Sequence, residues 1–242
     1  MISERTPKLR SDVFATLELD TDALTSQIAI AVPARNQGRY RGVVTDNNNG
    51  SKEFSLVVLP PPAEPSVAVN ASEDWAVPPV FSVVQYDDSN PKKKVGYLVV
   101  HTTDDAAGPR QIRIFNTTDV LFDNQKIGLD SAIVLKLFRP GKHLVTDKTG
   151  GGVCEVTVTY PPPPPPNWPT DKVIVNVLQD PKDPTKTQMQ PDKISISPLQ
   201  PVVFNTQNGT HLVTDLLAVT DRDGSTFVTT RTAKGNRVNV TI

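Results

Sequence analysis

The sequence predicts an all-β protein made of two or three small β-sandwich modules. Three observations predict this fold class. One short segment occurs twice nearly unchanged and a third time in weaker form, as expected when a chain reuses one structural unit. The apolar residues are chiefly Val, Ile and Leu beside many Thr, and these types favour strands. The chain also has 23 prolines, and proline destabilises the interior of a helix.

The repeated segment predicts the first elements. Residues 141–147 (GKHLVTD) recur as residues 209–215 (GTHLVTD), and residues 41–46 (RGVVTD) echo both. The first two copies in the chain each end on an aspartate. The sequence then runs through a Gly-bearing turn and a second β-rich segment to a proline fourteen positions on. These two stretches therefore predict equivalent hairpins, each closing a module.

Alternating apolar and polar residues predict further strands, each with one face for the core and one for solvent. Turns rich in Asp, Asn, Gly and Pro separate them, as in a sandwich of short strands. After the third copy of the repeat, residues 216–220 extend the strand before a turn at residues 221–224. The alternation is clearest at residues 13–19, 112–114, 156–159 and 238–241.

Proline tracts separate the predicted modules. Pro60–Pro62 ends the first module, and Pro161–Pro166 ends the second. Six consecutive prolines form a stiff helix of roughly 19 Å, which favours a spacer. A ligand for an SH3-like groove is the alternative, although no basic residue flanks the tract. The predicted organisation is an N-terminal β module (1–64), a β-sandwich module (65–160), a polyproline linker (161–169) and a C-terminal β-sandwich module (170–242).

A fainter echo links the second and third predicted modules. Residues 81–92 and residues 173–186 share a strand, an acidic turn and an Asn/Asp-Pro exit. At this level of pattern the chain resembles tandem immunoglobulin-like β-sandwich repeat proteins. The resemblance implies short strands in paired sheets joined by proline-rich connectors. The Cys, Trp, Cys framework of antibody domains is missing from the sequence, so no functional residue follows from the resemblance.

Composition narrows the function classes. The net charge is -1, with acidic and basic residues spread along the chain, which disfavours nucleic acids and anionic membranes as partners. The single cysteine, Cys154, excludes an intramolecular disulfide. Its place in a predicted strand favours a small buried side chain over a reactive thiol. The N-terminus shows no apolar leader region, so we expect no export through a signal peptide in this sequence.

The sequence predicts no catalytic residue and no cofactor. His143 and His211 occupy the same repeat position, but in a strand His143 lies about 13 Å from Asp147, too far for a catalytic His–Asp pair. The residues after the single cysteine offer no copper ligand. Asp221 and Asp223 are the remaining metal candidates, for calcium, because acidic turns hold hard cations. The same residues also serve tight turns unaided.

Four residues are predicted to take part in interactions: Trp75, Pro161, Pro166 and Trp168. The two tryptophans lie beside prolines at the entrances of predicted modules. There they either cap a core and pack against proline, or form a platform for a ligand.

By exclusion, the sequence favours a non-enzymatic structural or assembly protein. The leading hypothesis is a subunit of a virus or phage particle, such as a minor capsid, decoration or tail component. Its partners would be other protein subunits, copies of this chain included, and its location a virion or another extracellular assembly. The alternative is a surface-exposed adhesin or glycan-binding β-sandwich module. An enzyme would require a pocket that holds His143 or His211 beside a nucleophile.

Overall fold

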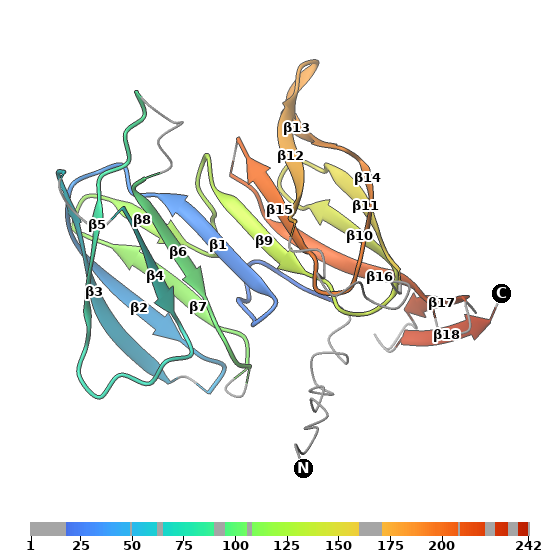
Figure 1. The fold of residues 1–242 in the computed structure, drawn as a ribbon, viewed down its shortest axis with the longest axis horizontal. Helices are drawn as coiled ribbons and strands as arrows, with labels where there is room; N and C mark the ends of the chain where they lie inside the picture. Colours follow the sequence, from blue (N-terminus) through green and yellow to red (C-terminus); the bar gives the residue numbers. More distant parts are fainter. Residues whose placement is uncertain are drawn as a thin grey trace, which may run out of the picture.

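The structure is a computed structural model that describes residues 18–48, 50–61, 65–89, 95–105, 108–159, 171–207, 209–220, 226–231 and 237–241. Every regular element within these ranges is a strand, so the all-β prediction is confirmed (Figure 1). No helix in the described part of the chain has the length and apolar character needed to cross a lipid bilayer.

The first half of the chain folds into eight strands whose side chains alternate between core and solvent. In the third strand Phe54, Leu56 and Val58 are buried, while Glu53 before them and Ser55 among them are exposed. This is the period-2 pattern of a strand with one face on a core. The strands are β1 (Ile28–Pro33), β2 (Gly38–Thr45), β3 (Ser51–Leu59), β4 (Ser66–Asn70), β5 (Val80–Val84), β6 (Tyr97–His101), β7 (Gln111–Phe115) and β8 (Val120–Asp123).

The second half supplies ten more strands. They are β9 (Ala132–Lys136), β10 (Gly141–Asp147), β11 (Val153–Val158), β12 (Val173–Asp180), β13 (Asp183–Gln190), β14 (Lys193–Ile196), β15 (Pro201–Thr206), β16 (Leu212–Thr220), β17 (Thr226–Arg231) and β18 (Arg237–Thr241).

Three of the four strands predicted from alternation are present, and most of the fourth lies outside the described residues. Residues 112–114, 156–158 and 238–241 lie in β7, β11 and β18. The remaining strand was predicted at residues 13–19, of which residues 13–17 lie outside the described residues. Glu18 and Leu19 precede an isolated bridge at Asp20 and belong to no strand.

The strands form three mixed sheets. A seven-stranded sheet has the order β13-β12-β15-β9-β1-β6-β4, a six-stranded sheet has the order β14-β11-β10-β16-β17-β18, and a five-stranded sheet has the order β5-β3-β2-β7-β8. The antiparallel pairing of β1 with β9 joins strands from the two halves, with Ala31 opposite Ala132. Figure 1 shows these two strands side by side in the middle of the molecule. The halves therefore share one sheet.

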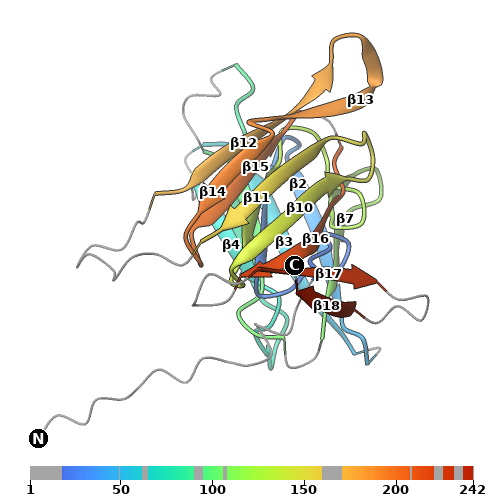
Figure 2. The ribbon, with the colours of Figure 1, turned by 90° about the vertical axis from the view of Figure 1, so that its right-hand side faces the viewer.

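The two halves repeat one pairing scheme. In the first half β2 pairs with β3, β3 with β5, β1 with β6, β4 with β6, β2 with β7, and β7 with β8. The second half repeats these pairs, in the same orientations, as β10 with β11, β11 with β14, β9 with β15, β12 with β15, β10 with β16, and β16 with β17. β13 and β18 have no counterpart among the described strands of the first half. The β12–β13 hairpin projects beyond the other strands (Figure 2).

The prediction of tandem immunoglobulin-like sandwiches is wrong. Tandem domains would each keep separate sheets, whereas here one sheet of seven strands runs through both halves. Equivalent units that hydrogen-bond edge to edge stack in the manner of a β-solenoid. The sheet also crosses the expected module boundary after residue 64, because β4 and β6 pair with each other and continue into β1. Of the predicted proline connectors, residues 62–64 and 160–170 lie outside the described residues.

The third copy of the repeat lies beside the second copy. It leads into β16, which pairs antiparallel with β10, the strand that carries the second copy. The repeated sequence encodes a strand with alternating burial, and that strand serves in two different places of the second half.

The core continues across the two halves. One cluster of buried apolar side chains includes Leu56 and Ile114 from the five-stranded sheet, Ile30 from the shared sheet and Val156 from the six-stranded sheet. Burial of apolar surface is the main favourable term in folding, so a shared core and a shared sheet together make the two halves one folding body.

Candidate functional site

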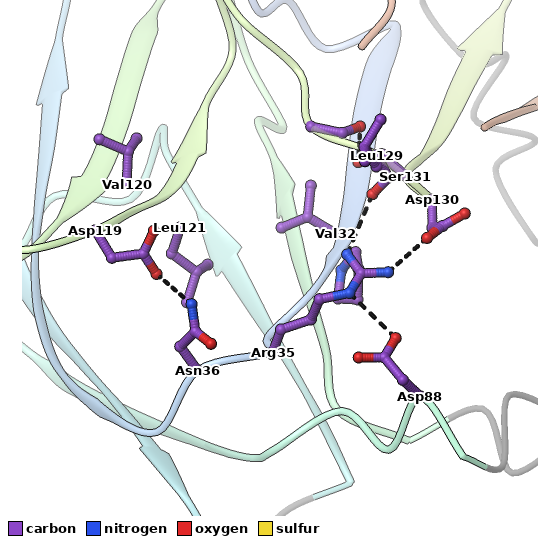
Figure 3. Close-up of a pocket in the computed structure, with 12 residues that line it drawn as sticks. Val32, Arg35, Asn36, Asp88, Asp119, Val120, Leu121, Leu129, Asp130 and Ser131 are labelled. Atoms are coloured by element: carbon purple, nitrogen blue, oxygen red, sulfur yellow. Dashed lines mark hydrogen bonds and ion pairs between the residues drawn. The ribbon is translucent and has the colours of Figure 1, made fainter. Parts of the chain in front are cut away.

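A groove lies where the two halves meet, and Arg35 is at its centre. Arg35 belongs to the turn between β1 and β2. Its Nε donates to Asp88 Oδ1 at 3.1 Å, and its Nη2 donates to Asp130 Oδ2 at 2.5 Å (Figure 3). Its Nη1 lies 3.5 Å from the carbonyl oxygen of Leu129. One guanidinium thus ties the β1–β2 turn to the loop after β5 and to the loop before β9.

Backbone bonds hold these loops in place. The amide of Tyr86 donates to the carbonyl of Ala34 at 2.9 Å, and the amide of Ala34 donates to the carbonyl of Gly96 at 2.7 Å. Asp130 has φ of 54°, a left-handed conformation that Asp adopts more readily than most residues. This conformation turns the chain sharply just before β9.

The groove has two lobes on either side of the Arg35 ion pairs. The first lobe has a volume of about 430 Å³ and is bordered by the apolar side chains of Val120 and Leu129, which are 46% and 54% exposed. Its polar wall comes from Asn36, whose Nδ2 donates to Asp119 Oδ2 at 2.8 Å. This lobe therefore combines exposed aliphatic surface with a fixed polar rim.

The second lobe has a volume of about 600 Å³ and draws residues from both halves. Tyr86 and Tyr97 form one wall, with their rings edge to face at 5.1 Å between centroids. Burial, helped by a hydrogen bond with Tyr86, raises the pKa of Tyr97 to about 12. The opposite wall carries exposed amides of the second half, from Asn176, Asn205 and Gln207.

Charge in the groove is mixed. The guanidinium of Arg35 carries one positive charge between the carboxylates of Asp88 and Asp130, and it also lies 5.5 Å from the centroid of the Tyr86 ring. Ion pairs this exposed add little to stability. Their donors and acceptors can instead rearrange toward a ligand or a partner protein.

Sequence reasoning did not find this groove. Arg35 lies 53 positions before Asp88 and 95 positions before Asp130. The three residues share no local motif. The acidic turn within residues 81–92 includes Asp88, but a turn of this kind is not by itself a signal of a binding site.

Only one of the predicted interaction residues can be placed. Trp75 is partly buried, with its ring edge to face with Phe54 and Phe81 at 5.6 and 6.2 Å. The ammonium of Lys52 lies 5.0 Å from the centroid of the Trp75 ring. Trp75 therefore packs on the core and lies outside the groove. Pro161, Pro166 and Trp168, together with the calcium candidates Asp221 and Asp223, lie outside the described residues.

The two repeat histidines have different surroundings. His143 is buried, and its Nε2 lies 2.9 Å from the carbonyl oxygen of Arg139. His211 is part-buried, and its Nε2 lies 2.8 Å from Asp20 Oδ1 and 3.5 Å from Asp22 Oδ2. The contacts of His211 could not be found from sequence spacing, because Asp20 lies 191 positions earlier in the chain.

Asp147, the aspartate that ends the second repeat copy, is a buried structural hub. Its Oδ1 accepts from the amides of Thr149 and His211, and its Oδ2 accepts from the amide of Gly150 and the hydroxyl of Thr187. It thereby fastens the β10–β11 turn to β13 and to the segment before β16.

Asp147→Asn is expected to lower the free energy of unfolding by about 1–2 kcal/mol. Either orientation of the new amide turns its NH₂ group toward two donors. Asp46→Asn is the matched control, because Asp46 caps the equivalent β2–β3 turn and, among the described residues, accepts through Oδ1 only, from the amides of Asn48 and Gly50. The free energy of unfolding of the Asp46→Asn variant should fall by well under about 1 kcal/mol. Urea unfolding of both variants measures the difference, and equal losses would contradict the role given to Asp147.

Comparison with known proteins finds no match to this chain among protein-family models, curated proteins or solved structures. The function is therefore argued from the geometry alone.

Proposed function

We propose that this protein is a non-enzymatic subunit of a larger protein assembly and that the groove between its halves is a docking surface for another subunit. The observation that carries the proposal is the exposure of Leu129 and Val120 beside Arg35 and the Tyr86–Tyr97 pair. Protein interfaces are enriched in Tyr and Arg, and their central contacts are apolar with a polar rim.

The architecture supports such a role. A sheet shared by both halves keeps the groove walls at a fixed spacing, because bending the molecule there would break the β1–β9 ladder. A preformed surface binds with less loss of conformational entropy than a surface that must order first. The exposed Arg35 ion pairs add little to this rigidity, and their groups can rearrange toward the partner.

A virus or phage particle is the assembly that we favour, with the chain as a minor capsid, decoration or tail component. Its location would then be the virion or another extracellular assembly, and its partners other protein subunits. Proteomic analysis of purified particles from the source tests this point: the chain should be present at fixed stoichiometry, and its absence from such particles would exclude this assembly.

Cross-linking mass spectrometry on the native complex tests the docking surface. We expect cross-links between a partner subunit and the loops at residues 34–37 and 124–131. Leu129→Asp should abolish them by placing a charge on the apolar rim. Val77→Asp is the matched control, because Val77 is an exposed aliphatic loop residue that does not line the groove. Cross-links that survive Leu129→Asp, or that vanish equally in both variants, would contradict the proposal.

A glycan-binding module is the second candidate, and the second lobe favours it. Exposed amides of Asn176, Asn205 and Gln207 face a tyrosine wall across about 600 Å³. Amides supply the donors and acceptors that hydroxyl groups need, and an aromatic face can pack on a sugar ring. A glycan array separates the two candidates: binding lost in Asn205→Ala would support this function, and an array without hits would remove it.

A further inference from the structure

We propose that Asp20, Asp22 and His211 form a binding site for one divalent transition-metal ion of the zinc type, which would fasten the segment before β1 to the segment before β16. One donor atom from each of these side chains lies within 4.8 Å of the other two. An imidazole nitrogen with two carboxylate oxygens is a donor set that zinc and related ions accept. The site is separate from the groove and does not depend on the proposed function.

The spacing of the donors fits such an ion. Bonds of about 2.0–2.1 Å in tetrahedral geometry place neighbouring donor atoms about 3.3 Å apart. The Nε2 of His211 lies 2.8 Å from Asp20 Oδ1 and 3.5 Å from Asp22 Oδ2, which brackets that value. An ion therefore requires only small movements of three side chains.

The backbone already holds the donors in place. The amide of Thr21 donates to the carbonyl of Leu212 at 3.0 Å, and the amide of Leu212 donates back to Thr21 Oγ1 at 3.1 Å. The side-chain amide of Asn124 donates to the carbonyl of Asp22 at 2.9 Å. A site fixed before the ion arrives loses less conformational entropy on binding.

A second observation points to a missing cation. The Oδ1 atom of Asp22 is buried and has no hydrogen-bond partner among the residues that the structure describes. A divalent ion would offset the cost of burying this carboxylate oxygen without a hydrogen-bond partner.

Histidine in the donor set favours a transition metal over calcium, which prefers six to eight oxygen ligands. The chain has three histidines. Substituting a histidine outside the proposed site therefore shows whether zinc binds there instead. His101→Gln is the matched control, because His101 lies in β6, away from the Asp20–Asp22–His211 cluster.

The test uses the full chain, freed of metal with EDTA and then titrated with zinc chloride, manganese chloride or calcium chloride. Isothermal titration calorimetry should give one zinc ion per chain, and scanning calorimetry should show a higher Tm with zinc than with calcium. His211→Gln and Asp22→Asn should each weaken zinc binding at least about tenfold, whereas His101→Gln should not change it. Both variants remove part-exposed side chains, and their circular dichroism without metal verifies folding.

Three results would overturn the proposal. The first is a Tm of the unaltered chain that zinc does not raise. The second is zinc binding that persists in a folded His211→Gln variant, and the third is calcium binding as strong as zinc binding.

Discussion

Phe54→Ala is expected to lower the free energy of unfolding by about 3–5 kcal/mol, the largest effect of any single substitution proposed for this chain. Phe54 is 1% exposed, and its ring contacts Trp75 and Phe81 edge to face, each at 5.6 Å between centroids. In the β2–β3 ladder it lies opposite Gly42, and a Cβ atom at that glycine would come within 2.2 Å of the ring. The ring thus occupies space that Gly42 leaves open, and alanine would leave a cavity there.

Phe115→Ala is the control for this substitution. Phe115 ends β7 and is only partly buried, with Arg113 5.0 Å from its ring centroid. Its replacement should cost about 1–2 kcal/mol. Urea denaturation followed by tryptophan fluorescence measures both. Comparable losses would mean that the three-ring cluster is not a centre of packing in the first half.

Gly141→Ala is expected to lower the free energy of unfolding by about 3 kcal/mol, from steric overlap and from backbone strain together. Gly141 begins β10 with φ of 143°, and a Cβ atom there would lie 2.0 Å from the carbonyl oxygen of Ala218 in β16. That oxygen belongs to the backbone of the paired strand, so the clash can be relieved only by moving the strand. The ladder also shifts register next to this point, between Lys142 and His143.

Gly38 provides the matched control, because it begins β2, the strand equivalent to β10, with φ of 149°. A Cβ atom there would meet no atom closer than 3.7 Å. Gly38→Ala carries the backbone strain without the overlap and should cost about 1 kcal/mol. Thermal unfolding of the two variants separates the contribution of backbone strain from that of steric overlap with β16. A loss at Gly38 as large as that at Gly141 would show that overlap with β16 is not the cause.

The strands were predictable because burial alternates along them. Phe54, Leu56 and Val58 face the core while Glu53 and Ser55 face solvent, and this order is visible in the sequence alone. The first two repeat copies form the predicted equivalent hairpins, with turns capped by Asp46 and Asp147. The first hairpin does not close its half, because β4 to β8 follow it. Local sequence encodes which side chains point inward and where a turn begins.

Sheet order was not predictable from the same signals. Alternation specifies the buried face of β1, but it does not specify that β9, about a hundred residues later, is its neighbour. The position of the third repeat copy was not predictable for the same reason. Its residues encode the same kind of strand as the second copy, but the sequence does not specify that β16 pairs with β10.

The candidate sites were missed for a related reason. The groove depends on Arg35, Asp88 and Asp130, which come from three loops. The proposed metal site likewise joins His211 to carboxylates that are 191 positions away for Asp20. Motifs detect donors that are close in sequence, whereas these donors meet only after the sheets have formed.

The pairing of β1 with β9 is the central claim, because the shared sheet, the continuous core and the groove all depend on it. Introducing Ala31→Cys together with Ala132→Cys tests this pairing directly. The two residues are opposite each other in the ladder, and cross-strand partners lie about 5 Å apart, within reach of a disulfide. Cys154 should not interfere, because it is buried, and burial raises the pKa of its thiol to about 11.

Ala31→Cys with Val134→Cys is the control. Val134 lies two residues beyond Ala132 in β9, and such a diagonal neighbour is about 7–8 Å from Ala31. Mass spectrometry after mild oxidation of the native monomer gives the result. An intramolecular disulfide that forms readily in the first pair and slowly or not at all in the second is the expected outcome. No disulfide in the first pair, or equal formation in both, would contradict the shared sheet.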